Sequence, residues 1–357
     1  MTPEPFRIAI ADEELDELRR RVARTRWPEP GDPRQGVGVD AVRALADRWV
    51  GEYDWRASEA QLNQWPQYTV TIDGQRIHYL HVRSPNADAL PLVITHGWPG
   101  GVNEFVHVIE PLRADFHLVI PSLPGYGFSG PTHELGWGPA RIARAWAALM
   151  AMLGYTRYGA QGGDWGSMVT NHLAALDPEH VVAVHLNLLM IGPPGNPDDF
   201  DDLSPREAAA RESMRRHAAE GRGYQMIQGT RPQTLSYGLT DSPVGLLAWI
   251  AEKFDEWTDV PVAVDDLLTN VSIYWFRRTA SSAARLYWES RHAPTPFPTL
   301  TQPLGVSCFP AEVMPRRRWV ERAYDLVQWT EHDRGGHFPA LEVPDLYVED
   351  VRTFFTR

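Results

Sequence analysis

Apolar and polar positions follow several different periods along the chain, and each period predicts a different kind of element. From Tyr68 to Val82 apolar residues alternate with polar ones on either side of Asp73-Gly74, which indicates a β-hairpin. An alanine-rich segment at 142–152 is typical of a helix. Strand-like apolar segments lie at 92–95, 116–120, 155–161 and 181–189. Strands that alternate with helices in this way predict a mostly parallel sheet with helices on both faces.

The alternation stops near residue 193 and resumes near residue 296. Between these points the pattern is mostly helical, with the clearest segments at 206–219, 244–257 and 267–290. Strand signals return at 305–309 and 326–330, and a last helix is expected at 344–355. The sequence therefore predicts a helical cap at 193–295, inserted between two parts of a sheet domain at 68–192 and 296–357.

Residues 1–67 have helical periodicity but too little apolar surface for a core of their own. Asp12 is expected to cap a first helix, which ends before Pro28. The apolar positions of this helix and of a second one are Leu15, Leu18, Val22, Val42, Leu45 and Trp49. We expect this N-terminal segment to wrap around the main domain.

Charge and composition argue against several classes of function. A net charge of −12 argues against a basic surface for phosphate groups, so nucleic acid is a poor candidate partner. Cys308 is the only cysteine, and no intrachain disulfide can form. The N-terminus lacks the pattern of a signal peptide, and no apolar run is long enough to span a bilayer. We expect a cytoplasmic protein, with a homodimer as the default oligomeric state.

The segment Gly162-Gly163-Asp164-Trp165-Gly166-Ser167 lies between a predicted strand and a predicted helix. Small residues two before and two after Asp164 suit the tight, strained turn of a nucleophile elbow. A serine there attacks acyl groups, whereas a carboxylate displaces a leaving group from carbon, as in an epoxide or an alkyl halide. No G-x-S-x-G occurs, since Ser129 in Gly127-Phe128-Ser129-Gly130 lacks the final glycine. We interpret Asp164 as a nucleophile, although a lone aspartate at this place could simply cap the next helix.

An ester on Asp164 needs a general base for its hydrolysis. His337, in Arg334-Gly335-Gly336-His337-Phe338, lies between the last strand and the last helix, where the histidine of this architecture belongs. Glu312, after the strand at 305–309, is the better candidate for the acid that orients His337. Asn187 at the other strand end has no carboxylate, and Asp333 shares a loop with His337.

Two further sets of groups fit this chemistry. His96-Gly97-Trp98-Pro99-Gly100 ends a buried strand, and we expect the backbone N–H groups of Trp98 and Trp165 to hold an oxyanion. Opening an epoxide also needs a donor for the departing oxygen, and a neutral tyrosine can supply it. The chemistry of the residues does not choose among the cap tyrosines Tyr224, Tyr237, Tyr274 and Tyr287.

A set of motifs is spread over nearly the whole chain. They are Thr25-Arg26-Trp27-Pro28, His96–Gly100, Pro124-Gly125-Tyr126-Gly127-Phe128-Ser129, Gly162–Ser167, Asp241-Ser242-Pro243-Val244-Gly245-Leu246 and Arg334–Phe338. With this set the chain resembles the epoxide hydrolases of the α/β-hydrolase fold, specifically their microsomal-type branch. The resemblance implies a mostly parallel sheet flanked by helices, an inserted helical cap and an N-terminal wrapping segment.

The resemblance also implies roles for individual residues. Asp164 corresponds to the nucleophile, His337 to the base, Glu312, after Phe309-Pro310, to the acid, and Tyr224 and Tyr287 to the ring-opening tyrosines. The expected reactants are a small-molecule epoxide and water, which give a vicinal diol without a metal or an organic cofactor. Eukaryotic members of this branch begin with a membrane anchor that this chain lacks, so we expect a soluble, bacterial member.

Two other functions fit parts of the same pattern. A haloalkane or haloacid dehalogenase uses the same aspartate elbow, but with halide-binding N–H donors in place of the tyrosine pair. A non-catalytic binding protein could retain the fold, although the intact Asp164, His337 and Glu312 argue against this reading. The cap residues Trp249, Trp257, Trp275 and Trp288 would suit an apolar or aryl substrate, or would simply form the core of the cap.

Overall fold

A nine-stranded sheet lies at the centre of the computed structural model, which describes residues 2–191, 200–296 and 298–357. The strands lie side by side in the order β1-β2-β3-β5-β4-β6-β7-β8-β9. Their bounds are Glu4–Phe6 (β1), Gln67–Ile72 (β2), Gln75–Val82 (β3), Leu90–Thr95 (β4), Phe116–Pro121 (β5), Tyr158–Gly162 (β6), Val181–Leu186 (β7), Leu304–Cys308 (β8) and Leu326–Glu331 (β9). Strands β5 to β9 of this order run parallel, and β1, β2 and β3 pair antiparallel at one edge.

This sheet confirms the strands expected from the apolar pattern, with small differences. The hairpin turns at Asp73 and Gly74, which both have positive φ, as a two-residue type I′ turn requires. The strand expected at 155–161 begins at Tyr158, because the residues before it form the turn that follows a helix. The short strand β1 was not predicted, since three residues carry no readable period.

Each face of the sheet packs against helices because successive side chains of a strand point to opposite sides. In β4, Leu92 and Ile94 join an apolar cluster with α4 (Ile109–Leu112) and α15 (Pro344–Phe355). Val93, between them, joins the other cluster, which includes α5 (Pro139–Met152) and α6 (Asp164–Leu176). The second cluster continues into the cap and the N-terminal helices, so the larger part of the core lies on that side.

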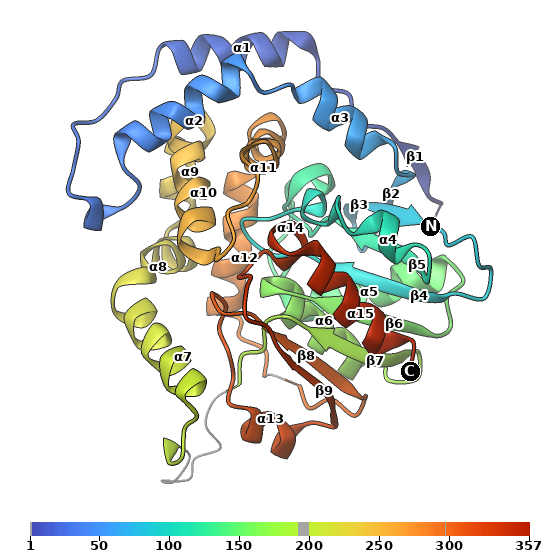
Figure 1. Cartoon of the computed structure of the whole chain (residues 1–357). Coiled ribbons are helices and arrows are strands. Elements are labelled where there is room, and N and C mark those ends of the chain that lie inside the picture. The colour runs from blue at the N-terminus through green and yellow to red at the C-terminus, as the bar shows by residue number, and fades with distance from the viewer. Residues whose placement is uncertain (1, 192–199, 297) are drawn as a thin grey trace.

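Six helices between β7 and β8 form the described part of the cap (Figure 1). Their bounds are Pro205–Arg216 (α7), Gly223–Thr230 (α8), Pro232–Asp241 (α9), Pro243–Trp257 (α10), Val264–Arg277 (α11) and Ala280–His292 (α12). The single helix expected at 267–290 is wrong, because the chain breaks at Arg278, whose φ is 53°. Helices α8 and α9 were not predicted, since each is short and carries few apolar residues.

The N-terminal segment joins the core sheet and the cap. Strand β1 pairs with β2 at the sheet edge, and α1 (Asp12–Ala23), α2 (Val39–Gly51) and α3 (Trp55–Asn63) arch over α10 and α11 (Figure 1). The expected cap at Asp12 is wrong: Ala11 is the N-cap residue, and no side chain caps this helix. Asp12 lies in the first turn, and its carboxylate instead pairs with Arg56 of α3.

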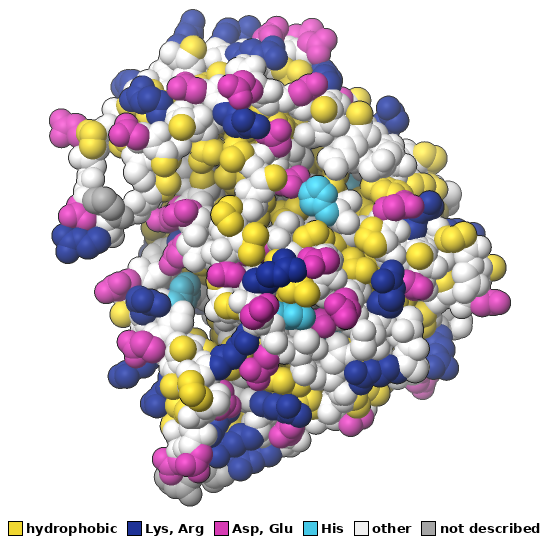
Figure 2. All heavy atoms as spheres, viewed as in Figure 1, with side chains coloured by type: hydrophobic (Ala, Val, Ile, Leu, Met, Phe, Trp, Pro, Cys, Tyr) yellow, Lys and Arg dark blue, Asp and Glu magenta, His cyan; other side chains and the backbone are white. Residues whose placement is uncertain are grey.

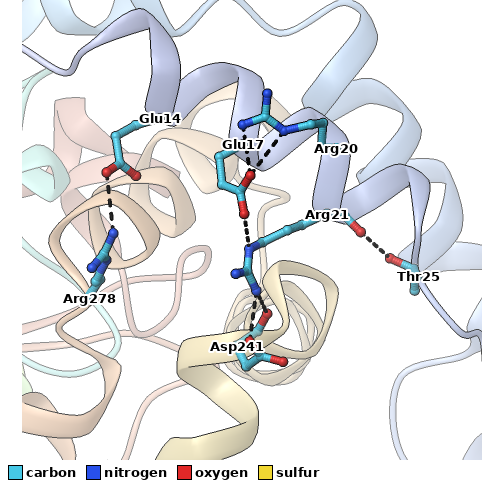
Figure 3. A network of polar contacts seen from close by, with 7 residues as sticks. All are labelled: Glu14, Glu17, Arg20, Arg21, Thr25, Asp241 and Arg278. Atoms are coloured by element: carbon cyan, nitrogen blue, oxygen red, sulfur yellow. Dashed lines mark hydrogen bonds and ion pairs between the residues drawn. The ribbon is translucent and has the colours of Figure 1, made fainter.

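Polar contacts fix the N-terminal helices to the cap. The Arg21 guanidinium donates to the Asp241 carboxylate at 2.8 Å, and Arg278 pairs with Glu14 at 3.3 Å (Figure 3). These side chains are partly exposed, so solvent weakens both pairs. A buried contact lies beneath them, where the indole N–H of Trp49 donates to Ser272 Oγ at 2.8 Å.

The surface carries both signs of charge. Acidic and basic side chains are interspersed over the face seen in Figure 2. No helix among the described residues combines the length and the apolar character that crossing a bilayer requires.

We expect Trp49→Phe to lower the free energy of unfolding by about 1–3 kcal/mol, because it leaves the buried Ser272 hydroxyl without its donor. Urea denaturation of Trp49→Phe, Ser272→Ala and the double variant measures the coupling between the two residues. The double variant should lose less stability than the sum of the single changes. Strictly additive losses would contradict a stabilising hydrogen bond between the N-terminal segment and the cap.

Candidate active site

Asp164 lies at the carboxyl end of β6, on the sharp turn into α6. Its φ is +47°, a conformation that residues other than glycine adopt only under strain. A Cβ atom on Gly166 would lie 1.9 Å from the Thr95 carbonyl oxygen, so only glycine allows this approach of α6 to β4. The predicted elbow therefore exists, and it lifts the Asp164 side chain off the edge of the sheet.

The loop after β4 brings a hydrogen-bond donor to this carboxylate. Strands β4 and β6 are parallel neighbours, and Thr95 pairs in register with Gly162, so the segments that follow them lie side by side. The backbone N–H of Trp98 donates to Asp164 Oδ1 at 2.7 Å. Gly97 permits this contact, because a Cβ atom there would lie 2.1 Å from the same oxygen.

His337 and Glu312 approach Asp164 from the ends of β9 and β8. The Nδ1 atom of His337 lies 2.6 Å from Glu312 Oε2, and its Nε2 atom lies 3.8 Å from Asp164 Oδ2. Glu312 Oε1 accepts the N–H of Val313 at 2.6 Å, which fixes the other side of this carboxylate. The three side chains thus form a row, with one nitrogen of His337 facing its carboxylate partner and the other facing Asp164.

Burial and neighbouring charges determine the pKa values of His337 and Asp164. Burial alone lowers the pKa of His337, but the charge and hydrogen bond of Glu312, together with the charges of Asp164 and Glu104, raise it to about 9. Burial raises the pKa of Asp164, while the charge of His337 and the N–H groups of Trp165 and Trp98 oppose this rise. The positive charge of a protonated His337 therefore favours the ionised form of Asp164, and the negative charge of Asp164 favours the protonated form of His337.

The two other candidates for the acid lie elsewhere. The Asn187 amide oxygen, just after the end of β7, accepts a hydrogen bond from Gln161 of β6 at 2.9 Å. Asp333 is exposed, whereas the side chain of Glu312 is only 5% exposed and contacts the His337 ring directly. The structure therefore brings Glu312 to His337, in preference to Asp333 or Asn187.

Two of the four cap tyrosines meet at Trp98. The Tyr224 ring stacks on the Trp98 ring with 5.1 Å between centroids, and Tyr287 meets the same ring edge-on at 5.7 Å. Burial and the charge of Asp164 raise the pKa of Tyr224, and burial raises the pKa of Tyr287, so both remain protonated donors at neutral pH. Tyr237 is 73% exposed, and the Tyr274 hydroxyl donates to the Gly100 carbonyl oxygen at 3.1 Å.

Two of the four cap tryptophans lie near the site, and the other two lie elsewhere in the cap. Trp257 packs edge-on against Tyr224 and lies 4.9 Å from the His337 ring, and Trp249 lies 6.4 Å from Trp98. Trp275 instead lies under Arg21 of the N-terminal segment, and Trp288 stacks on His292. Aromatic rings from the cap therefore pack against Trp98 and His337, the two residues that flank Asp164.

The structure adds residues that the sequence did not single out. The N–H of His337 donates to the Trp257 carbonyl oxygen at 2.9 Å, so the end of α10 holds the histidine loop. The buried Glu342 carboxylate accepts the N–H groups of Phe338, Asp259 and Val260 and ties the same two segments together. No sequence period marks these contacts, because they join backbone groups about eighty residues apart.

Glu104 is a further buried carboxyl group near His337. Burial raises its pKa to about 8, and the nearby Asp164 charge adds to the rise although His337 opposes it. This glutamate follows the His96–Gly100 motif by only four residues. That proximity was the one signal that could have directed attention to it.

Comparison with known proteins agrees with this geometry. Residues 3–105 match the family model described as epoxide hydrolase N terminus, and residues 91–220 match the model described as alpha/beta hydrolase fold. The solved structure of Aspergillus niger epoxide hydrolase superimposes with a TM-score of 0.93 at 35% identity, covering 100% of this chain and 96% of that one.

Two relatives align along almost the whole length. A protein of Stigmatella aurantiaca, provisionally named an epoxide hydrolase, is 45% identical over 98% of this chain and 84% of its own. Epoxide hydrolase 1 of Sus scrofa is 32% identical over 98% of this chain and 88% of its own. The chain therefore belongs to the epoxide hydrolase family, within the α/β-hydrolase fold.

Proposed function

We propose that this epoxide hydrolase opens its substrate through a covalent ester on Asp164. The observation that carries the proposal is the unequal environment of the two carboxylate oxygens. Oδ1 accepts the N–H of Trp98 at 2.7 Å, whereas Oδ2 faces His337 across 3.8 Å, beyond hydrogen-bond distance. Oδ2 is thus the oxygen with a lone pair available for attack on carbon.

In the first half-reaction, Oδ2 forms a bond to an epoxide carbon and the carbon–oxygen bond of the ring breaks. The electron pair goes to the epoxide oxygen, which takes a proton from Tyr224 or Tyr287. The products are an alcohol, an ester on Asp164 and a tyrosinate. A dehalogenase would have no use for this pair of phenol donors, so their place at Trp98 supports the epoxide chemistry.

In the second half-reaction, His337 first releases its proton to solvent. The neutral ring, oriented by Glu312, then takes a proton from water, and the hydroxide adds to the Asp164 carbonyl carbon. The negative charge develops on Oδ1, where the N–H of Trp98 stabilises it. We assign the second donor to the N–H of Trp165, which also hydrogen-bonds the Asp164 carboxylate. Collapse breaks the ester bond, and His337 returns its proton to the departing diol oxygen. The acid form of Asp164 then gives its proton back to the tyrosinate, so the enzyme returns to its starting state.

The substrate class follows from the walls of the site. The aromatic rings of Trp98, Trp249 and Trp257 favour an apolar epoxide, including one with an aryl group. A dimeric state and a cytoplasmic location remain predictions from the sequence.

We expect His337→Gln to form the ester but to hydrolyse it slowly, because the base is lost. Intact-protein mass after mixing with styrene oxide should increase by one epoxide. The same mixture with His337→Gln/Asp164→Ala should show no increase. A wild type that makes diol, combined with a His337→Gln variant that never gains mass, would contradict the covalent route.

We expect Tyr224→Phe and Tyr287→Phe each to slow ester formation, because each removes one donor to the epoxide oxygen. Removing both should slow it by a factor on the order of 10²–10⁴. The matched control is Tyr237→Phe, which changes an exposed tyrosine of the same cap and should form the ester at the wild-type rate. Rapid-quench mass spectrometry in the His337→Gln background measures ester formation alone, and an unaffected double variant would rule out this role.

We expect hydrolysis of the ester to accelerate as the pH rises, because only neutral His337 can accept a proton. The charge of Asp164 helps to raise the pKa of His337 to about 9 in the free enzyme, and the ester removes that charge. The midpoint of the pH profile should therefore lie below 9. Pulse formation of the ester followed by a pH jump gives this profile, and a midpoint at or above 9 would be inconsistent with the proposed charge state.

A further inference from the structure

Lys253 is the only lysine of the chain, and it lies in α10 beside the site. Its side chain is only 5% exposed, which is unusual for a group that normally extends into water. The ammonium group contacts Glu256 at 2.7 Å and Glu252 at 3.0 Å, and both carboxylates are at least one-third exposed. Solvent therefore screens the two carboxylates more strongly than it screens the buried ammonium group.

The buried side of this ammonium group faces two aromatic rings of the site. Lys253 Nζ lies 5.0 Å from the centroid of the Tyr224 ring and 5.6 Å from that of Trp257. Both distances are within the range of cation–π attraction. The Tyr224 ring also stacks on Trp98, so the cation and Trp98 both lie against this ring.

The acidic groups around Tyr224 disfavour a negative charge on its phenol oxygen. Asp164, Glu312 and Glu256 all raise the pKa of this phenol, in addition to the effect of burial, and a hydrogen bond with Tyr287 only partly offsets them. The His217 ring lies 6.4 Å from Tyr224, but burial lowers the pKa of His217, so it is neutral at neutral pH. Among the residues that the structure describes, Lys253 is the cation whose ammonium group lies over the Tyr224 ring.

Ring opening moves one negative charge within the site. Before the reaction the charge is on Asp164, and afterwards it is on the epoxide oxygen or on the tyrosine that donated to it. A fixed cation on the receiving side stabilises this transition state without any rearrangement of solvent. Hydrolysis of the ester does not build charge at Tyr224, because its oxyanion forms on Asp164 beside Trp98.

We propose that Lys253 is a positioning residue that accelerates ring opening by stabilising, through the face of Tyr224, the negative charge that arrives there. This inference rests on the proposed function, since it needs the ester on Asp164 and the donor role of Tyr224. It also predicts selectivity between the two half-reactions. Loss of the charge should slow ester formation and leave ester hydrolysis unchanged.

The test compares Lys253→Met, which keeps the length and apolar contacts of the side chain, with Lys253→Arg, which keeps the charge. Rapid-quench mass spectrometry with styrene oxide measures ester formation and decay separately. We expect ester formation to slow about tenfold or more in Lys253→Met, with decay within about twofold of wild type. Lys253→Arg should recover most of the rate. Arg231→Met, which removes an exposed cap cation, serves as the control and should match wild type.

The outcomes separate the two proposals. If wild type and His337→Gln form the ester and Lys253→Met forms it equally fast, the role of Lys253 is refuted and the proposed function stands. If both half-reactions slow together and Lys253→Arg does not recover, Lys253 has only a structural role. If His337→Gln forms no ester while wild type makes diol, the proposed function fails, and the inference fails with it.

A second measurement does not depend on a variant at Lys253. Growth with ¹³C,¹⁵N-labelled lysine labels one residue, so its NMR spectrum contains a single lysine spin system. The Hε signals should lie upfield because of ring currents from Tyr224 and Trp257. They should shift again when styrene oxide alkylates Asp164 in His337→Gln. Signals that do not change on alkylation would refute the electrostatic link.

Discussion

The left-handed backbone at Asp164 is the constraint on which the rest of the site depends. A residue with a side chain does not keep a φ of +47° unless its surroundings hold it there. The close approach of Gly166 to β4 and the hydrogen bond from Trp98 provide this hold, and both come from the in-register ends of β4 and β6. The Asp164 carboxylate is therefore held in one orientation, and Trp98 and His337 lie around it in that orientation.

Those partner groups come from parts of the chain that the sheet alone would not bring together. Glu312 and the histidine loop follow β8 and β9, whereas Tyr224, Tyr287 and the carbonyl group that holds His337 belong to the cap. The N-terminal segment has its own part in this arrangement, because β1 joins the sheet while the helices after it pack on α10 and α11. The site is thus complete only when sheet and cap are assembled, and the N-terminal segment contacts both of them.

The sequence predicted the parts of this arrangement that leave a local pattern. The elbow has its glycines, the buried strands have their apolar runs, and α10 and α15 begin and end within a residue or two of the expected positions. It did not predict the break at Arg278, because a left-handed residue other than glycine gives no local signal. Nor did it choose Tyr224 and Tyr287 without the family resemblance, since their shared neighbour, Trp98, lies more than a hundred residues away in sequence.

The hydrogen bond between the N–H of His337 and the carbonyl oxygen of Trp257 also limits how the enzyme can move. Glu342 strengthens this junction by accepting N–H groups from both segments. A cap that lifted away at the end of α10 would pull His337, the proposed general base, out of its place beside Glu312. Hydrolysis of the ester therefore needs this corner of the cap to be closed, since the contact that anchors the cap also places the histidine.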